Sequence, residues 1–153
     1  MENLIILEIE NLNNYPEYID EQNKSWREAM IENGDNPFIY IFALIDRRVV
    51  GRAHFQKIYH APYPINDKQW WNGNLRVHDD YQRKGIAQKI IETGIENLRT
   101  KGVETLSCGI ETDNTASINL YKKLLFKISD NQEPINRQNF HGLGEVRIYK
   151  RIL

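Results

Sequence analysis

One stretch of the chain, residues 77–87 with the sequence Val-His-Asp-Asp-Tyr-Gln-Arg-Lys-Gly-Ile-Ala, reads as the end of a strand, a tight turn and the opening of a helix. A glycine at the mouth of a helix, here Gly85, lets backbone N–H groups approach a ligand closely. The first turn of a helix also carries unpaired N–H groups and the positive end of the helix dipole. Because Arg83 and Lys84 precede the glycine, the stretch predicts a site for an anion, most often a phosphate.

The sequence after this turn alternates between helical and strand patterns. Apolar residues recur at helical spacing from Ile86 to Leu98, and Gly102 marks the end of that helix. Residues 103–111 are predicted as a strand, and a second helix follows at about residues 112–125, with several capping candidates at its start. Strand, helix, strand and helix in succession indicate a βαβ unit with a parallel strand pair.

The first half of the sequence predicts strands that pair with their neighbours in the chain. Residues 38–45 and 49–59 flank a short turn, which favours a hairpin. Joining this hairpin to the parallel pair predicts a mixed sheet. The remaining assignments are strands at 4–9, 74–78, 126–129 and 145–152, one or two helices within 16–33, and loops at 61–73 and 130–144.

The overall composition limits the classes of function. A length of 153 residues favours one domain, 1–153, and 20 basic against 21 acidic residues argue against a general nucleic-acid binder. The longest apolar run, residues 39–45, is far shorter than the roughly 20 residues that span a membrane. The N-terminus lacks the basic segment of a signal peptide, and the single cysteine, Cys108, fits a reducing compartment. We therefore expect a cytoplasmic protein with neither nucleic-acid nor membrane partners.

The turn matches neither of the two best-known phosphate-binding motifs. It lacks the Gly-x-x-x-x-Gly-Lys-Ser/Thr of a P-loop and the three glycines of a dinucleotide fingerprint. Its spacing, Gln-x-x-Gly-x-Ala, instead resembles the acetyl-CoA motif of the GCN5-related N-acetyltransferase (GNAT) family. A second pattern downstream, Asn-x-x-Ser-x-x-Leu-Tyr-x-x-x-x-Phe, is also typical of that family. The resemblance covers about residues 74–128 and is carried by Gln82, Gly85 and Ala87 and by Asn114, Ser117, Leu120, Tyr121 and Phe126.

The resemblance implies both a fold and a reaction. The implied fold is α/β (α+β), with a mixed, mostly antiparallel central sheet of about six or seven strands, helices on both faces and a parallel strand pair around the coenzyme site. The implied reaction transfers the acetyl group of acetyl-CoA directly to a primary amine of a small molecule or peptide, and it needs no metal. A non-catalytic acyl-CoA-binding or sensing module of the same fold is the alternative, and a homodimer is left open.

The resemblance also implies roles for particular residues. Backbone N–H groups of the turn would hold the coenzyme pyrophosphate, and an N–H near Arg76 or Val77 would stabilise the thioester oxygen. The family's general acid maps to Tyr121, which alternatively only packs in the core. Because a phenol of pKa about 10 is a weaker acid than a thiol of pKa about 8.5, Tyr121 would either hydrogen-bond to the developing charge or give up its proton late. The implied coenzyme contacts are Arg76, Val77, Gln82, Arg83, Lys84, Gly85, Ile86, Ala87, Asn114 and Ser117.

Other assignments stay open at the level of the sequence. Asn114 is a helix cap, a coenzyme contact or both, and Lys122 is a further cation that could lie near the predicted anion site. The aromatic segment 59–64 and the pair Trp70-Trp71 either cage a cationic acceptor or bury a loop against the sheet. The base that neutralises the attacking amine has four candidates, which are His54, His78, Asp79 and Glu111.

Overall fold

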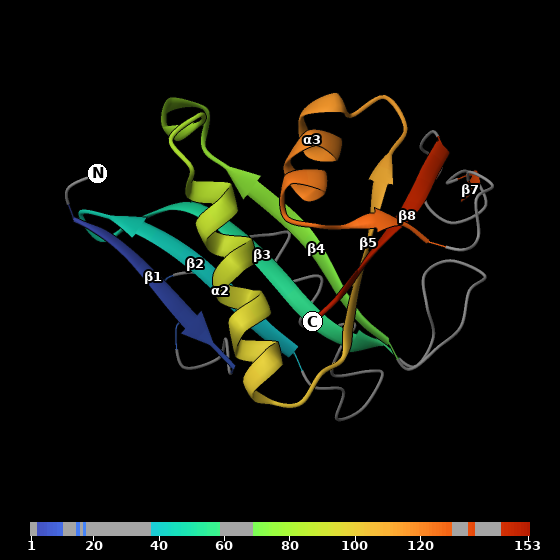
Figure 1. Ribbon diagram of the computed structural model, residues 1–153. Coiled ribbons are helices and arrows are strands. Elements are labelled where there is room, and N and C mark those ends of the chain that lie inside the picture. The colour runs from blue at the N-terminus through green and yellow to red at the C-terminus, as the bar shows by residue number, and fades with distance from the viewer. Residues whose placement is uncertain are drawn as a thin grey trace.

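A mixed sheet of eight strands forms the centre of the molecule (Figure 1). The computed structural model describes residues 3–10, 15, 17, 38–58, 69–129, 135–136 and 145–153. The strand order is β1-β2-β3-β4-β5-β8-β6, and β7 also pairs with β8. Every pairing is antiparallel except that of β4 with β5, which confirms the predicted mixed sheet. The strands are β1 (Leu4–Ile9), β2 (Phe38–Ile45), β3 (Arg48–Ile58), β4 (Gln69–Val77), β5 (Thr105–Glu111), β6 (Lys127–Ile128), β7 (Ile135–Asn136) and β8 (Glu145–Ile152).

The hairpin of β2 and β3 is confirmed, and its turn shows why the two strands pair closely. Asp46 and Arg47 form a two-residue loop, and their φ angles are 50° and 66°. Positive φ at both central residues is the pattern of a type I′ turn, whose twist matches that of the flanking strands. β2 itself is buried on both faces, because Ile39 and Ile41 join one hydrophobic cluster while Tyr40 and its alternate neighbours join another.

Two predicted loops were partly wrong. β4 begins at Gln69, so the residues from there to Gly73 are strand rather than loop. Trp70 and Trp71 are both buried within β4, which excludes these two side chains from a loop that cages a cation. The strand forms because β3 and β5 flank it on both sides, and this pairing outweighs the low strand propensity of its Asn and Gly residues. In the predicted loop 130–144, the pairing with β8 likewise creates the short β7.

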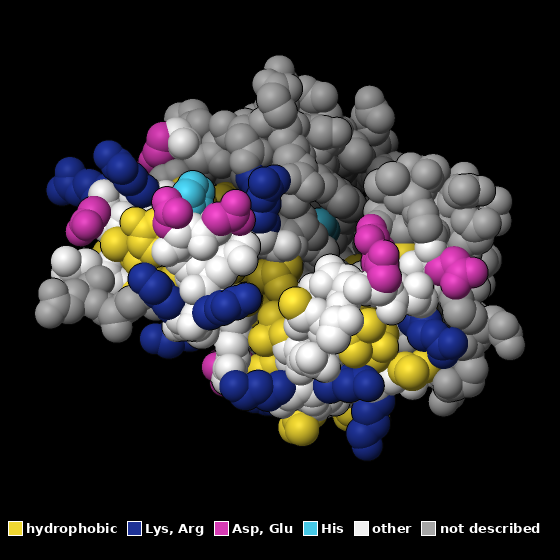
Figure 2. Space-filling model, turned by 90° about the horizontal axis from the view of Figure 1, so that it is seen from above, with side chains coloured by type: hydrophobic (Ala, Val, Ile, Leu, Met, Phe, Trp, Pro, Cys, Tyr) yellow, Lys and Arg dark blue, Asp and Glu magenta, His cyan; other side chains and the backbone are white. Residues whose placement is uncertain are grey.

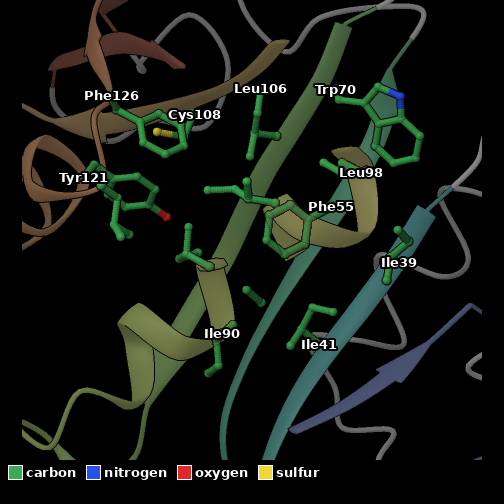
Figure 3. Packing of buried hydrophobic residues seen from close by; sticks show 14 of the residues in the cluster. Ile39, Ile41, Phe55, Trp70, Ile90, Leu98, Leu106, Cys108, Tyr121 and Phe126 are labelled. Carbon is green, nitrogen blue, oxygen red and sulfur yellow. The ribbon is translucent and has the colours of Figure 1, made fainter. Parts of the chain in front are cut away.

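Two helices pack on one face of this sheet (Figure 1). α2 (Ile86–Thr100) has its buried apolar side chains at the predicted helical spacing and covers β2 and β3. α3 (Thr115–Lys123) follows β5, and Tyr121 is its buried residue. A single turn of 3-10 helix, η3 (Asp79–Tyr81), lies between β4 and α2. Figure 3 shows side chains of both helices converging on the same core, with Phe55 beneath α2 and Tyr121 beside Phe126.

Several predictions fall outside the described residues. The helical segment 16–33 is one of them, so the expectation of helices on the second face of the sheet stays a prediction. The aromatic segment 59–64 is another. The single-domain organisation over 1–153 also stays a prediction. In the part of the chain that the structure describes, no helix is long and apolar enough to cross a membrane.

Candidate functional site

The parallel strands β4 and β5 are joined at one end and separate toward the other. Their register pairs only Trp70 with Leu106 and Trp71 with Ser107, although both strands continue for several residues. A cavity of about 410 Å³ lies where the two strands separate. Facing edges of separated strands present backbone N–H and C=O groups that need partners, so this cavity suits an extended polar ligand. Its lining comprises Asn72, Gly73, Leu75 and Arg76 from β4, residues 108–111 from β5, and Asn114, Ser117 and Tyr121 at α3.

A second cavity, of about 480 Å³, continues the first past the end of β4. Leu75, Arg76 and Ser117 line both cavities, so the two cavities adjoin each other. Seen from above, Lys and Arg side chains lie around this part of the surface, beside an apolar hollow between two lobes (Figure 2). The other residues that line the second cavity are Val77, Tyr81, Gln82, Arg83, Gly85, Ile86, Ala87, Gln88, Ala116, Leu120 and Lys123.

The turn before α2 has the backbone geometry of an anion site. Gly85 is the N-terminal cap residue of α2, has φ of 79° and makes no side-chain capping bond. Arg83 is also left-handed, with φ of 61°, whereas Lys84 between them is not. Alternating handedness of this kind turns successive N–H groups toward one concave site. Among the described residues, the backbone N–H groups of residues 85–88 form no hydrogen bond, so these donors are available to a ligand.

The side chain of Gln82 holds this turn in shape. Its Nε2 donates to the Val77 carbonyl oxygen at 3.1 Å and to Asp79 Oδ1 at 3.1 Å. The bond to Val77 ties the end of β4 to the residue just before the left-handed Arg83. The side chain of Gln82 therefore braces the loop around the predicted anion site. Lys84 lines neither cavity, and its Nζ lies 5.7 Å from the centre of the Tyr81 ring as a cation–π pair.

The edge of β4 orients one further backbone donor. The His78 N–H donates to the Val50 carbonyl oxygen of β3 at 2.8 Å. Because successive N–H groups along a strand point to opposite edges, the Val77 N–H points away from β3 and toward the gap beside β5. Of the two predicted donors to a thioester oxygen, the alternation therefore favours Val77 over Arg76.

Tyr121 is buried at the point where the two strands begin to separate. Its side chain is 4% exposed, and its Oη donates to Asn72 Oδ1, while Asn72 Nδ2 donates to the His54 carbonyl oxygen at 3.0 Å. Phe126 packs edge-on against the Tyr121 ring, with centroids 5.0 Å apart. Burial raises the pKa of Tyr121 well above its usual value, and the neighbouring Cys108 adds to the rise. The hydroxyl is thus a neutral donor over the whole range in which proteins are normally assayed.

The remaining candidates separate clearly in space. Asn114 is the N-cap of α3, since its Oδ1 accepts from the Ser117 N–H at 3.1 Å, and both residues also line the first cavity. Of the four candidate bases, Glu111 lines that cavity, whereas His78 and Asp79 are exposed at the turn. His54 is buried, and desolvation followed by the charge of Arg52 lowers its pKa to about 4.

Sequence reasoning missed two kinds of cavity residue. Lys123 rather than Lys122 lines the second cavity, and Ala116 and Leu120, which share the apolar side of α3, line it as well. Helical spacing indicates that such residues share a face but does not distinguish a ligand cavity from a protein core. Asn72 was missed altogether because it lies in a stretch predicted as loop, and no motif marks it.

The chain matches the family model described as "Acetyltransferase (GNAT) family" over residues 4–126. Two curated relatives are similar over shorter regions. The [ribosomal protein bS18]-alanine N-acetyltransferase of Salmonella typhimurium is 35% identical over 72 residues, which cover 47% of this chain and 45% of the relative. The L-methionine sulfoximine/L-methionine sulfone acetyltransferase of Pseudomonas aeruginosa is 32% identical over 65 residues, or 42% and 38% of the two chains. The chain thus spans about half the length, or less, of the curated relatives it matches.

Solved structures support the same fold over nearly the whole chain. The ribosomal-protein-S18-alanine N-acetyltransferase from Escherichia coli superposes with a TM-score of 0.68 at 21% identity and covers 97% of this chain and 93% of its own. A GNAT family acetyltransferase from Elizabethkingia anophelis with acetyl-CoA bound gives a TM-score of 0.66 at 17% identity, with full coverage of both chains. The family model covers most of the sequence, and these two solved structures share the fold of this chain. The chain belongs to the acetyltransferase (GNAT) family.

Proposed function

We propose that this chain is an N-acetyltransferase that moves the acetyl group of acetyl-CoA directly to a primary amine of a small molecule or a peptide. One observation carries the proposal. Two adjoining cavities lie between the turn before α2 and Tyr121, and Leu75, Arg76 and Ser117 line both of them. The backbone N–H groups at the start of α2 would bind the phosphates of a long coenzyme at one end, and the hydroxyl of Tyr121 would lie near its thioester at the other.

The turn is suited to the pyrophosphate of the coenzyme. The N–H groups of residues 85–87 would face the pyrophosphate, and the positive end of α2 favours negative charge there. The adenosine phosphate would find cations at the rim, where Arg83 and Lys123 line the second cavity. Nothing in this arrangement needs a metal, and the expectation of a metal-free site stays a prediction.

The gap between the strands is suited to the acyl-carrying arm. An extended amide-containing chain can bond to the unpaired edge of β4 as an additional strand would. The thioester oxygen would then accept from the Val77 N–H, which acts without any reorganisation as negative charge develops. The hydroxyl of Tyr121, which lines the first cavity, would then meet the leaving sulfur.

Tyr121 serves this reaction as a hydrogen-bond donor to the leaving sulfur. Even at the ordinary pKa values of a phenol and a thiol, moving the proton from tyrosine to thiolate is uphill by about 2 kcal/mol. The raised pKa of Tyr121 makes that transfer harder still. Stabilising the thiolate by a short contact while keeping the proton on oxygen avoids this cost.

The amine must reach the thioester as a neutral nucleophile. An amine of pKa about 10 is almost fully protonated at pH 7, which costs about 4 kcal/mol. Glu111 is the candidate base that lines the cavity, and it can accept the proton directly or through water. The buried His54, with a pKa of about 4, is a poor proton acceptor at neutral pH.

The decisive measurement is release of free thiol from acetyl-CoA in the presence of a panel of amines. The panel should contain free amino acids, a peptide with an N-terminal alanine and a polyamine. The amino acids and the peptide are included because one relative is named as an acetyltransferase of alanine in a ribosomal protein and another as an acetyltransferase of methionine derivatives. Calorimetric titration with CoA should be run in parallel. Binding of CoA with no thiol release from any amine would favour the non-catalytic acyl-CoA-binding module. Absence of CoA binding would contradict the proposal as a whole.

A further inference from the structure

Asn72 lies at the point where β4 and β5 separate. It follows Trp71, whose pairing with Ser107 is the last between the two strands. The side chain is 5% exposed and lines the cavity that also holds Tyr121. A buried amide beside a cavity is costly unless both of its polar ends are bonded, and both ends of Asn72 are. These two bonds join the backbone of β3, the edge of β4 and the middle of α3.

The bonds also determine which way the Asn72 amide faces. The His54 carbonyl oxygen can only accept, so the NH₂ group of Asn72 must face it, as the 3.0 Å contact shows. The amide oxygen of Asn72 therefore faces Tyr121 and can only accept. Tyr121 has one hydroxyl proton and must donate it to Asn72. In this arrangement the phenol oxygen consequently presents lone pairs, rather than its proton, to any group beside it.

A thioester sulfur competes poorly for that proton, whereas a thiolate competes well. Neutral sulfur is a weak acceptor compared with an amide oxygen. A hydrogen bond to an ionised acceptor is roughly twice as strong as one between neutral groups. The preference of the Tyr121 hydroxyl thus reverses only when negative charge builds up on sulfur. An interaction that forms only in the transition state raises the turnover rate without tightening substrate binding.

We propose that Asn72 is a positioning residue that holds the Tyr121 hydroxyl until the thioester breaks, when the hydrogen bond passes from Asn72 Oδ1 to the leaving sulfur. This proposal rests on the acetyltransferase function proposed above. In the step itself, the amine nitrogen bonds to the acetyl carbon, the C–S bond breaks and its electron pair leaves on sulfur. The surplus proton of the amine goes to the base or to water. Tyr121 keeps its own proton throughout and changes only the acceptor.

The kinetic test compares Asn72→Leu, which keeps the size of the side chain, with Tyr121→Phe and the double variant. We expect Asn72→Leu to lower kcat by about 10-fold or more while KM for acetyl-CoA changes by less than about 3-fold, because the hydroxyl is no longer held in line. The double variant should be no slower than Tyr121→Phe alone, since both changes remove one interaction. The matched control is Asn97→Leu, which removes an amide bonded to Glu8 on the far side of α2 and should leave kcat unchanged. Losses of kcat that multiply in the double variant, or an unchanged kcat in Asn72→Leu, would overturn the proposal.

A second measurement needs neither turnover nor a variant at position 72. Tyrosine labelled with carbon-13 at Cζ gives one NMR signal per tyrosine, and Tyr121→Phe identifies the signal of Tyr121. At a pH where the thiol of CoA is ionised, CoA should shift this signal, whereas desulfo-CoA, which binds without a sulfur, should not. Equal shifts with both ligands would overturn the exchange of acceptors while leaving coenzyme binding intact. Failure of both ligands to bind would instead overturn the proposed function and the exchange together.

Discussion

Gly94 of α2 lies directly against the ring of Phe55 on β3. A β-carbon built on Gly94 would be 2.1 Å from Phe55 Cζ, far inside van der Waals contact. Phe55 is fully buried and cannot move aside without disturbing its neighbours. The glycine therefore sets how closely α2 approaches the sheet, and with it the position of the turn at the start of α2.

Gly94→Ala should destabilise the protein despite placing a better helix former in a helix. Overpacking costs about 1–3 kcal/mol, and it outweighs the roughly 1 kcal/mol that alanine gains over glycine in helix propensity. Urea unfolding measures the difference. The neighbouring exposed Glu92→Ala should stay within about 0.5 kcal/mol of the wild type. An unfolding midpoint for Gly94→Ala at or above that of the wild type would show that the helix can shift at no cost.

Gly85 and Gly102 provide a matched pair of substitutions at the two ends of α2. Their φ angles are 79° and 78°, and a β-carbon on either would meet nothing within 4 Å. Alanine at either position should therefore cost about 1–2 kcal/mol of stability through backbone strain alone. Only Gly85→Ala should also weaken CoA binding, by about 10-fold, because its methyl group crowds the N–H groups that face the pyrophosphate. Calorimetric titration with CoA measures the two affinities. Equal CoA affinities in the two variants would show that the turn is not part of the coenzyme site.

Tyr121→Phe should lower kcat by about 100-fold, within the range for a group that assists proton or charge transfer. The loss follows from removing the phenol hydroxyl of a residue that lines the cavity where β4 and β5 separate. The variant also leaves Asn72 Oδ1 without its donor, which should cost about 1–3 kcal/mol of stability. Tyr149→Phe, at another buried tyrosine, is the control for kcat. Full turnover in Tyr121→Phe with normal CoA binding would restrict Tyr121 to packing.

His54 should make the protein less stable in mild acid. Its pKa is about 4 in the folded protein and about 6.5 when unfolded, so between these values the unfolded chain binds the extra proton. The contribution of His54 is fully present above pH 6.5 and falls by about 3 kcal/mol as the pH drops to 4. Denaturant unfolding across this window should show a shallower pH dependence in His54→Gln than in the wild type. The exposed His78→Gln is the control, and identical slopes in all three proteins would contradict the assignment.

Cys108 should resist thiol reagents in the native protein. It is 2% exposed, and burial raises the pKa of its thiol, which depletes the reactive thiolate. Because it is the only cysteine of the sequence, a colorimetric thiol titration reports on it alone. Reaction should be at least about 100-fold slower in buffer than in denaturant, since it then depends on opening of the fold. Rapid stoichiometric labelling without denaturant would show instead that the thiol is accessible from the cavity that Cys108 lines.

Local features of the fold could be predicted from the sequence because they depend on neighbours in the chain. The turn of β2 and β3, the apolar face of α2, the cap at Asn114 and the bounds of β8 all follow from short-range patterns. The turn at Gly85 belongs to the same group, since a helix start and a glycine define it, and its binding of an anion stays a prediction. Only the family resemblance assigned Gln82 and Tyr121 to the same predicted site, because no periodic pattern in the sequence links these two residues.

Tertiary structure alone decided the features that depend on residues distant in the chain. The pairing of β4 with β3 and β5 is the reason that β4 begins at Gln69. The same pairing buries Trp70 and Trp71 in the core, where they cannot form a cage for a cation. The cavity exists because β4 and β5 pair at two positions and then separate, which no local pattern encodes. Asn72 accepts a hydrogen bond from Tyr121, which lies 49 residues further along the chain. No sequence pattern around either residue indicates this contact. The sequence by itself thus determined the glycine-containing turn before α2, which we predict to bind an anion. The packing of distant strands determined which cavity and which side chains lie beyond that turn, because a hydrogen bond between remote side chains is specified only once the sheet has formed.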